Sequence, residues 1–430
     1  MTRRVTMTIE CNATHDPSRK SWIASANDSS GDFPIQNLPF GVFRAGGRAR
    51  GGVALGDQII DLGALLEAGL LHGAAAEAAA AASGHTLAPL LACDPGAVSA
   101  LRAALSDLFR EGGTGDPARL EAVLVPQASA ELLLPLKPTA FTDFCTSYDH
   151  IARMGGATPR LAALALPVAY NGRASSVAPS GTPVLRPCGQ FETSPGSGDI
   201  RFGPEPMLDF ELEFGVWLRS GNALGDPIGL GGAEAALFGC CLVNDWSARG
   251  IQFFESVLGP HLGKSFLTTI SPWIVTMEAL APFRIAARGR GAGEPEVPSY
   301  LLGDFDRQHG AFDIELTAEL NGVRIVRSNL NLLYWTLAQM VAHQASNGAP
   351  LEPGDLVATG TVSGAAEEAR ACLAEITWRG GKPIQLPDGS SRNWLEDGDT
   401  LKLCGRALAD GFVSIGFGAC SGTIQPARNA

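Results

Sequence analysis

Short runs in which apolar and polar positions alternate cover most of the chain beyond about residue 140, and they predict β-strands. The runs are rich in apolar residues and are punctuated by Gly, Pro, Asn or Asp, as is typical of strands. Helical spacing in this part is confined chiefly to residues 331–345. The runs read FELEFGVWL, CCLVND, PWIVTM, FDIELTAEL, DLVATGTV and ACLAEITW. We therefore predict a strand-dominated C-terminal domain with few helices rather than a doubly wound sheet.

The N-terminal third has a different pattern. Residues 1–31 are polar, which predicts a flexible extension. Short apolar runs then alternate with Gly-rich turns, and a Gly-Asp turn at 56–57 separates two runs that could pair as a hairpin. Residues 62–83 and 98–110 carry Ala and Leu at helical spacing. This part is predicted to be a small β-rich domain with helices attached.

The length of 430 residues favours two domains, or one large domain with an appendage, because single cores stop growing well below that size. The change in pattern predicts where they divide. The predicted organisation is a flexible extension (1–31), an N-terminal domain (32–135) and a C-terminal catalytic domain (136–430).

Charge and cysteine usage narrow the functional classes. The net charge of -12 argues against a nucleic-acid partner and against anionic membranes, whereas local Arg and Lys could still bind a small anionic substrate. No apolar run reaches the ~18–20 residues of a membrane-spanning helix, and the N-terminus lacks the apolar core of a secretory signal. Nine cysteines without a CxxC pair indicate reduced thiols in a cytoplasmic protein rather than a zinc site or disulfides.

Acidic residues concentrate in the alternating stretch 209–214, DFELEF. Successive side chains of a strand point to opposite faces, so Asp209, Glu211 and Glu213 are predicted to share one face. Like charges at this spacing repel one another, and a cation between them would remove the repulsion. On the pattern alone, a solvated polar strand face is the more common explanation, because acidic alternation is frequent on exposed faces.

Two further segments contribute carboxylates, and one of them a histidine, that could act together with this stretch. Asp245 follows the apolar run CCLV and precedes a predicted helix, where it could be an N-cap or an active-site residue. Asp143 lies in the segment FTDF at 141–144 and is followed seven residues later by His150. With Glu211 and Glu213 they offer four carboxylates and no His or Cys ligand, a set that suits Ca²⁺ or Mg²⁺ better than zinc. Arg249 and Lys264 could offset the excess negative charge.

Motifs along nearly the whole chain carry a family resemblance. They occur in order at residues 32–43 (DFPIQNLPFGVF), 166–177 (LPVAYNGRASSV), 209–213 (DFELE), 244–249 (NDWSAR), 262–266 (LGKSF), 271–273 (SPW), 333–335 (LYW), 354–356 (GDL) and 360–361 (GT). On these segments the sequence resembles the fumarylacetoacetase family. The resemblance implies a mainly β (α+β) fold with an N-terminal SH3-like β-barrel and a C-terminal mixed β-roll, paired as a homodimer.

The resemblance also implies an activity: metal-dependent hydrolysis of a carbon–carbon bond in a small anionic 1,3-diketo acid, the last step of tyrosine and phenylalanine breakdown. It implies that the four carboxylates ligate the metal and that His150 is the general base, oriented by Glu375. Further implied roles are anion stabilisation by Arg249, Gln252 and Lys264, a second cation near Lys264 and Thr268, and substrate contacts by Tyr170 and Thr361.

The sequence departs from the family pattern at several positions. Cys145 and Ser256 stand where the family has substrate-binding tyrosines, and Tyr148 could replace one lost phenol. The expected substrate-binding arginine matches Arg160 only with a small length change, and Arg153 competes for that role. These departures favour a relaxed or different acyl group. A decarboxylase or isomerase with the same metal site, and a non-catalytic metal-stabilised protein, are alternatives that retention of His150 and Glu375 disfavours.

Overall fold

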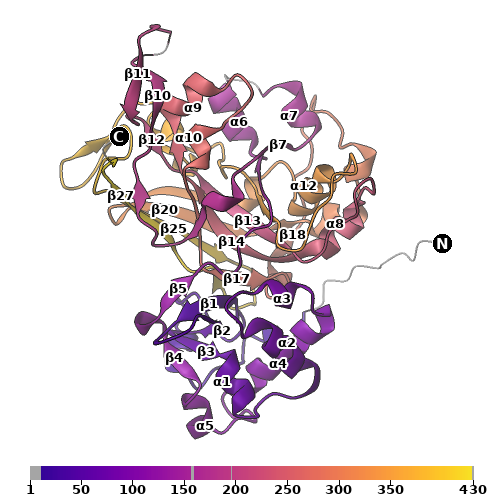
Figure 1. Cartoon of the computed structure of the whole chain (residues 1–430). Helices are drawn as coiled ribbons and strands as arrows, with labels where there is room; N and C mark the ends of the chain where they lie inside the picture. The colour runs from indigo at the N-terminus through magenta and orange to yellow at the C-terminus, as the bar shows by residue number, and fades with distance from the viewer. Residues whose placement is uncertain (1–10, 156–158, 195, 429–430) are drawn as a thin grey trace.

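The computed structural model describes residues 11–155, 159–194 and 196–428 (Figure 1). It is a mixed α/β fold built on a 13-stranded, mostly antiparallel sheet and a six-stranded sheet, with two-stranded pairs at the periphery. The N-terminal strands and helices form the smaller lobe in Figure 1, and the remaining elements form the larger lobe. In the described part of the chain, every helix is too short or too polar to span a bilayer.

Part of the predicted flexible extension is packed against the smaller lobe. Residues 1–10 lie outside the described residues, whereas two short 3₁₀ helices, η1 (Ala13–His15) and η2 (Ala24–Asn27), follow them. The buried Arg102 guanidinium donates to the Thr14 hydroxyl at 2.9 Å and thereby ties this segment to a helix of the lobe.

The smaller lobe combines a strand meander with helices. Its strands are β1 (Phe40–Arg44), β2 (Arg50–Leu55), β3 (Gln58–Asp61), β4 (Leu124–Pro126) and β5 (Glu131–Leu133). Its helices are α1 (Leu62–Glu67), α2 (Gly73–Ala82), α3 (Ala88–Leu91), α4 (Pro95–Phe109) and α5 (Pro117–Glu121). Strands β2 and β3 pair antiparallel around the turn at Gly56 and Asp57, so the predicted hairpin is confirmed, and the two predicted helical stretches are confirmed with α1, α2 and α4.

The strand order shows an open path rather than a barrel. It runs β4-β3-β2-β1 and continues into β17 (Trp273–Thr276), and no closed barrel forms among the described strands. The predicted SH3-like barrel is therefore not confirmed. Gly41 faces Trp273 across the β1–β17 pair, and a Cβ at Gly41 would lie 2.4 Å from the Trp273 ring. Glycine is required there for the two lobes to share one sheet.

The larger lobe places five strands side by side at its centre. β13 (Leu212–Leu218) pairs antiparallel with β14 (Leu237–Asp245) and with β22 (Leu356–Ala358), and β22 pairs parallel with β6 (Phe141–Cys145). β7 (Val168–Asn171) completes this edge. The six-stranded sheet contains β9 (Val184–Leu185), β20 (Ile314–Leu320), β21 (Val323–Asn329), β25 (Thr400–Ala407), β26 (Ile415–Gly416) and β27 (Cys420–Gln425). One apolar cluster fills the space between the sheets, where the Phe214 and Phe417 rings meet edge to face at 5.1 Å.

The remaining elements flank this core. The helices are α6 (Tyr148–Gly155), α7 (Leu161–Ala165), α8 (Leu230–Ala236), α9 (Arg249–Glu255), α10 (Leu262–Ser265), α11 (Asp304–His309), α12 (Leu337–Gln344) and α13 (Leu373–Ile376). The short strands are β8 (Val177–Pro179), β10 (Cys188–Glu192), β11 (Ile200–Pro204), β12 (Leu208–Asp209), β15 (Ser247–Ala248), β16 (Thr268–Ile270), β18 (Arg284–Ile285), β19 (Ala311–Phe312), β23 (Ile384–Gln385) and β24 (Ser391–Arg392).

Several local predictions need correction. The run ACLAEITW is not a strand but contains α13, because the Asp209 carboxylate accepts hydrogen bonds from the Leu373 and Ala374 amides at the start of that helix. Asp245 does not cap a helix: it ends β14, and α9 begins only at Arg249. The helical pattern at 331–345 is confirmed for Leu337–Gln344.

Candidate active site

Four buried carboxylates carried on or beside β6, β13 and β14 converge at one end of the central sheet. Asp143 lies on β6, Glu213 on β13, Glu211 just before β13, and Asp245 at the end of β14. One oxygen from each lies within 4.8 Å of the others. All four residues are buried, so the alternative of a solvated strand face is excluded.

Asp209 does not share this cluster, contrary to the prediction from alternation. The strand is interrupted between β12 and β13, which releases Asp209 from the face that carries Glu213. Its carboxylate binds Arg249 Nε at 2.8 Å and accepts the two amide hydrogen bonds from α13. Asp209 therefore links the elements that carry Arg249 and Glu375.

Three carboxylate oxygens in the cluster have no hydrogen-bond partner among the residues that the structure describes: Asp143 Oδ1 and both oxygens of Glu213. Burial and the neighbouring carboxylates raise the pKa of both residues well above its usual range. Unpaired buried carboxylates are costly, and coordination of a cation removes that cost. The all-oxygen donor set and its orphaned oxygens fit a hard dication such as Ca²⁺ or Mg²⁺.

Two buried cations balance the other side of the cluster. Lys264 Nζ forms ion pairs with Asp245 at 2.9 Å and with Glu211, and Arg249 Nη2 lies 2.8 Å from Glu211 Oε1. Burial raises the pKa of Glu211, but the charges of Lys264 and Arg249 lower it by a larger amount, so it lies well below its usual range. Burial lowers the pKa of Lys264, but Asp245 and Glu211 raise it more, so the ammonium stays charged.

Thr268 also contacts the same cluster, because its hydroxyl donates to Asp245 Oδ1 at 2.8 Å. Lys264 and Thr268 therefore border the four carboxylates rather than a separate acidic cluster. A protonated Lys264 side chain has no lone pair to bind a metal, and in the structure its ammonium group neutralises the carboxylates of Glu211 and Asp245.

His150 stands on the opposite side of Glu211 from Lys264. It lies in the first turn of α6, where Ser147 Oγ accepts a hydrogen bond from its amide. His150 Nδ1 is 3.1 Å from Glu375 Oε2, and its Nε2 is 3.9 Å from Glu211 Oε1. An ionised Glu375 favours a proton on Nδ1, which leaves Nε2 as the basic nitrogen facing the carboxylate cluster.

Glu375 is held by an unusually full set of donors. Besides His150, its carboxylate accepts from Ser363 Oγ at 2.5 Å, Arg153 Nη1 at 3.1 Å and Cys372 Sγ at 3.5 Å. Burial raises the pKa of Glu375, but His150, Ser363 and Arg153 lower it by a larger amount, so it falls to about 2. The sequence had no signal for Ser363 or Cys372, which lie outside any recognisable motif.

The structure brings only some predicted substrate-contacting residues to the cluster. The Tyr170 hydroxyl donates to Asp245 at 2.6 Å, and the Thr361 hydroxyl lies 3.4 Å from His150 Nε2. Gln252 accepts a hydrogen bond from Arg249 at 3.1 Å. Cys145 is partly buried two residues beyond Asp143 on β6.

Two predicted residues lie apart from these. Ser256 is exposed at the end of α9, and its hydroxyl bonds to the backbone of the same helix at Gln252. Arg160 is exposed and precedes α7, and within the described ranges its side chain makes no ion pair with the cluster. Arg153, its competitor, binds Glu375 instead of facing outward. The Tyr148 ring packs near Tyr334, with centroids 6.1 Å apart.

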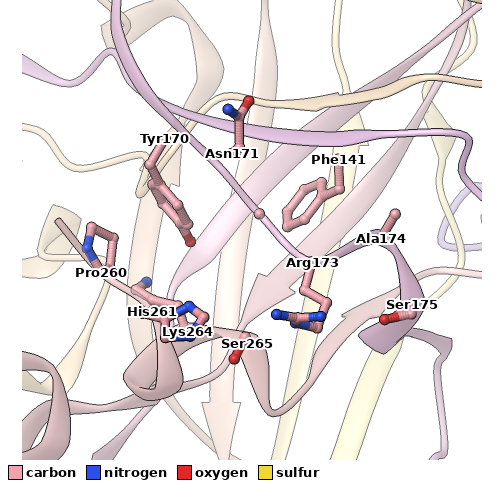
Figure 2. Close-up of a pocket in the computed structure, with 11 residues that line it drawn as sticks. Phe141, Tyr170, Asn171, Arg173, Ala174, Ser175, Pro260, His261, Lys264 and Ser265 are labelled. Carbon is pink, nitrogen blue, oxygen red and sulfur yellow. The ribbon is translucent and has the colours of Figure 1, made fainter. Parts of the chain in front are cut away.

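A cavity of about 370 Å³ opens beside the cluster (Figure 2). Tyr170 and Lys264, which both contact Asp245, form part of its wall, and Arg173, His261 and Ser265 line it as well. Its volume falls within the range of sites for small organic molecules. Neither Arg173 nor His261 is among the site residues that the sequence predicts.

Comparison with known proteins adds an independent line of evidence. Residues 139–425 match the family described as fumarylacetoacetate (FAA) hydrolase C-terminal, and residues 36–135 match fumarylacetoacetase N-terminal. The chain is 42% identical to fumarylacetoacetase from Oryza sativa subsp. japonica over 92% of this chain and 95% of that protein. It is 40% identical to the Homo sapiens fumarylacetoacetase over 95% of this chain and 99% of that protein.

A solved structure resembles the fold. Fumarylacetoacetate hydrolase from Exiguobacterium antarcticum superposes with a TM-score of 0.51 at 16% identity, covering 91% of this chain and 100% of that one. At this identity the likeness concerns the fold alone.

Proposed function

The chain belongs to the fumarylacetoacetase family, and from that premise we propose that it hydrolyses a carbon–carbon bond of the 1,3-diketo acid fumarylacetoacetate, giving fumarate and acetoacetate. The observation that carries the proposal is the juxtaposition of a buried His–Glu pair with four converging carboxylates. This arrangement unites a base for water with a site for a hard cation. Both are needed to cleave between two carbonyl groups.

His150 acts as the general base. Its Nε2 takes a proton from water, whose oxygen attacks the carbonyl carbon next to the bond that breaks. Glu375 holds the Nδ1 proton and stabilises the imidazolium that results, as a carboxylate does in a Ser-His-Asp triad. When the tetrahedral adduct collapses, the electron pair of the carbon–carbon bond passes to the leaving fragment as an enolate. The imidazolium returns the proton to that fragment.

Asp143, Glu211, Glu213 and Asp245 would hold the cation, for which we propose Ca²⁺ or Mg²⁺. When bound, it supplies Lewis-acid polarisation of the diketone oxygens and stabilises the enolate. Tyr170 and Thr268 keep Asp245 oriented through their hydroxyls.

Three polar side chains supply donors where negative charge develops. Arg249 and Lys264 border Glu211, and Gln252 contacts Arg249; together they carry the positive charge and N–H groups that an oxyanion requires. Arg249 Nη2 lies 2.8 Å from Glu211 Oε1 without an aligned hydrogen bond to it, so its N–H groups can also reach an adduct beside Glu211. Each such donor typically contributes about 3–4 kcal/mol to barrier lowering.

The test is a direct assay of the full-length protein. Loss of the enol absorbance of fumarylacetoacetate, and the appearance of fumarate, are followed with Ca²⁺ or Mg²⁺ and after treatment with a chelator. Cation-dependent formation of fumarate and acetoacetate supports the proposal. Absence of cleavage in the presence of either cation contradicts it.

A different acyl group is the second candidate, because neither Cys145 nor Ser256 offers a phenol to the substrate. The same assay over a panel of acylpyruvates and acylacetoacetates separates the two. A specificity constant for fumarylacetoacetate at least tenfold above every other substrate favours the first candidate.

We also propose that the protein is a homodimer, following the family resemblance. Light scattering coupled to size-exclusion chromatography tests this, and a mass of one chain across micromolar concentrations contradicts it.

A further inference from the structure

The cavity beside the carboxylate cluster is bounded by two segments that are distant in sequence. One follows β7 and carries Arg173, and the other leads into α10 and carries His261 and Lys264 (Figure 2). Figure 2 shows the Arg173, His261 and Lys264 side chains gathered along the same part of the wall, with the Tyr170 hydroxyl directed toward Lys264.

The two segments are locked together, so the cavity is preformed. Ser176 Oγ donates to the Ser265 carbonyl at 2.6 Å. Just beyond these residues, β8 pairs parallel with β16 through Val177 and Thr268. These contacts fix the spacing of the two walls without any ligand.

Two glycines bring the walls close to the core. A Cβ at Gly172 would lie 2.3 Å from the Phe141 ring, and a Cβ at Gly263 would lie 2.6 Å from Gln252 Cβ. Neither residue can therefore be larger without moving the chain. Their close packing sets the positions of the adjacent Arg173 and Lys264.

The cavity is lined by basic side chains, whereas the neighbouring cluster consists of four carboxylates. Its described lining includes Arg173, His261 and Lys264 but no Asp or Glu. Lys264 is neutralised by Glu211 and Asp245, whereas the Arg173 guanidinium has no ion pair or hydrogen bond among the residues that the structure describes. In a chain of net charge -12, an unpaired arginine on a preformed cavity favours an anionic ligand.

We propose that this cavity is the subsite for a terminal carboxylate of the substrate, with Arg173 as its principal anion-binding residue and His261 as a second contact. The inference rests on the proposed function, because the diketo acid carries a carboxylate at each end. With the diketone at the four carboxylates, one end extends past Lys264, which touches both the cluster and the cavity. A guanidinium can bind such a carboxylate through two parallel hydrogen bonds.

Binding of the product fragments tests the subsite without turnover. Fumarate and acetoacetate are titrated separately by calorimetry into the full-length protein with Mg²⁺ or Ca²⁺. Arg173→Gln is expected to weaken binding of one fragment about tenfold or more, because a charge-assisted hydrogen bond is lost. The fragment affected identifies which end of the substrate the cavity holds. Arg173→Lys should recover part of the affinity, and His261→Asn should have a smaller effect.

Arg324→Gln is the matched control, since Arg324 is exposed on β21 in the other sheet and makes no recorded ion pair within the described ranges. It should bind both fragments within twofold of the unmodified protein. Equal thermal stability of the two glutamine variants shows that any loss is not unfolding. If Arg173→Gln binds both fragments as Arg324→Gln does, the inference is overturned.

Steady-state kinetics provide the second arm. Arg173→Gln should raise KM for the diacid about tenfold, and a diketo acid with the corresponding carboxylate replaced by an amide should respond less than twofold. Equal losses on both substrates would also overturn the inference. Failure of the proposed function has a different signature: the unmodified protein would not cleave the diacid, and the calorimetric arm would still decide whether the cavity binds a carboxylate.

Discussion

Two buried glutamates within one site differ in how fully their oxygens are paired. Glu375 accepts from four side chains, His150, Arg153, Ser363 and Cys372, whereas neither oxygen of Glu213 has a hydrogen-bond partner within the described part of the chain. Burial and the neighbouring carboxylates raise the pKa of Glu213, whereas His150, Ser363 and Arg153 outweigh burial and lower the pKa of Glu375. The half of the site formed by His150 and Glu375 is therefore complete as an acid–base pair. The half formed by the carboxylate cluster is incomplete, because no side chain in the described ranges pairs with either oxygen of Glu213.

The strongest way to test the complete half is to remove its base. His150→Ala should lower kcat by about 10²–10⁴-fold, because the water loses its proton acceptor. Enol absorbance of the diketo acid measures the loss. His85→Ala, at an exposed position in the smaller lobe, is the control and should retain full turnover. Turnover in His150→Ala equal to that of this control would remove His150 from the mechanism.

The incomplete half is tested by its response to cations. Relative to chelated protein, Ca²⁺ or Mg²⁺ at 100 times its Kd should stabilise the fold by about 2.7 kcal/mol, because only the folded chain assembles the four carboxylates. Glu213→Gln should abolish most of this stabilisation and turnover with it. Differential scanning calorimetry with chelator and with each cation measures the change. Glu67→Gln, on the exposed side of α1, should respond like the unmodified protein; an undiminished response of Glu213→Gln would contradict the assignment.

Arginine substitutions test the donors around Glu375 one at a time. Arg153→Gln should lower kcat about tenfold, since a charge-assisted hydrogen bond that orients the His150 partner is lost. Arg160→Gln, at the exposed position that the family resemblance assigns to substrate, should alter KM rather than kcat. Separate kcat and KM values decide between these roles. The assignment of Arg153 to orientation of Glu375 fails if its substitution changes KM alone.

The smallest effect is expected at a third buried carboxylate, outside the site. Burial raises the pKa of Asp306 from 3.8 to about 6, although the Thr336 hydroxyl donates to it at 2.6 Å. Because the folded pKa is the higher one, stability is lost as the pH rises from about 4 through about 6. The free energy of unfolding of Asp306→Asn, relative to that of the unmodified protein, should therefore rise by about 1–2 kcal/mol as the pH increases from 5 to 7. Turnover should not change. A pH-independent difference in chemical denaturation would contradict this account.

Local sequence patterns predicted most of what depends on nearby residues. The turn at Gly56 and Asp57, the helix Leu337–Gln344 and the common direction of Glu211 and Glu213 all follow from patterns within a few positions. Family resemblance, rather than periodicity, supplied the association of Glu375 with His150, which lies 225 residues away.

Predictions failed where distant contacts decide local structure. The stretch from Ala371 to Trp378 has the composition of a strand, yet it forms α13 because Asp209 satisfies the amides at the start of that helix. The same contacts draw Asp209 away from the acidic face that alternation predicted. Arg173 and His261 escaped notice for a related reason: only the close packing at Gly172 and Gly263 brings them to one cavity.

The pairing of β1 with β17 makes the stability of each lobe depend on the other lobe. If the smaller lobe were removed, β17 would present unpaired amides and carbonyls beside the indole of Trp273, and an open edge of this kind recruits strands from other molecules. A truncated catalytic lobe would therefore be prone to aggregate. We expect the two lobes to unfold as one cooperative unit. The amide-exchange protection of Trp273–Thr276 should therefore be lost together with that of Phe40–Arg44.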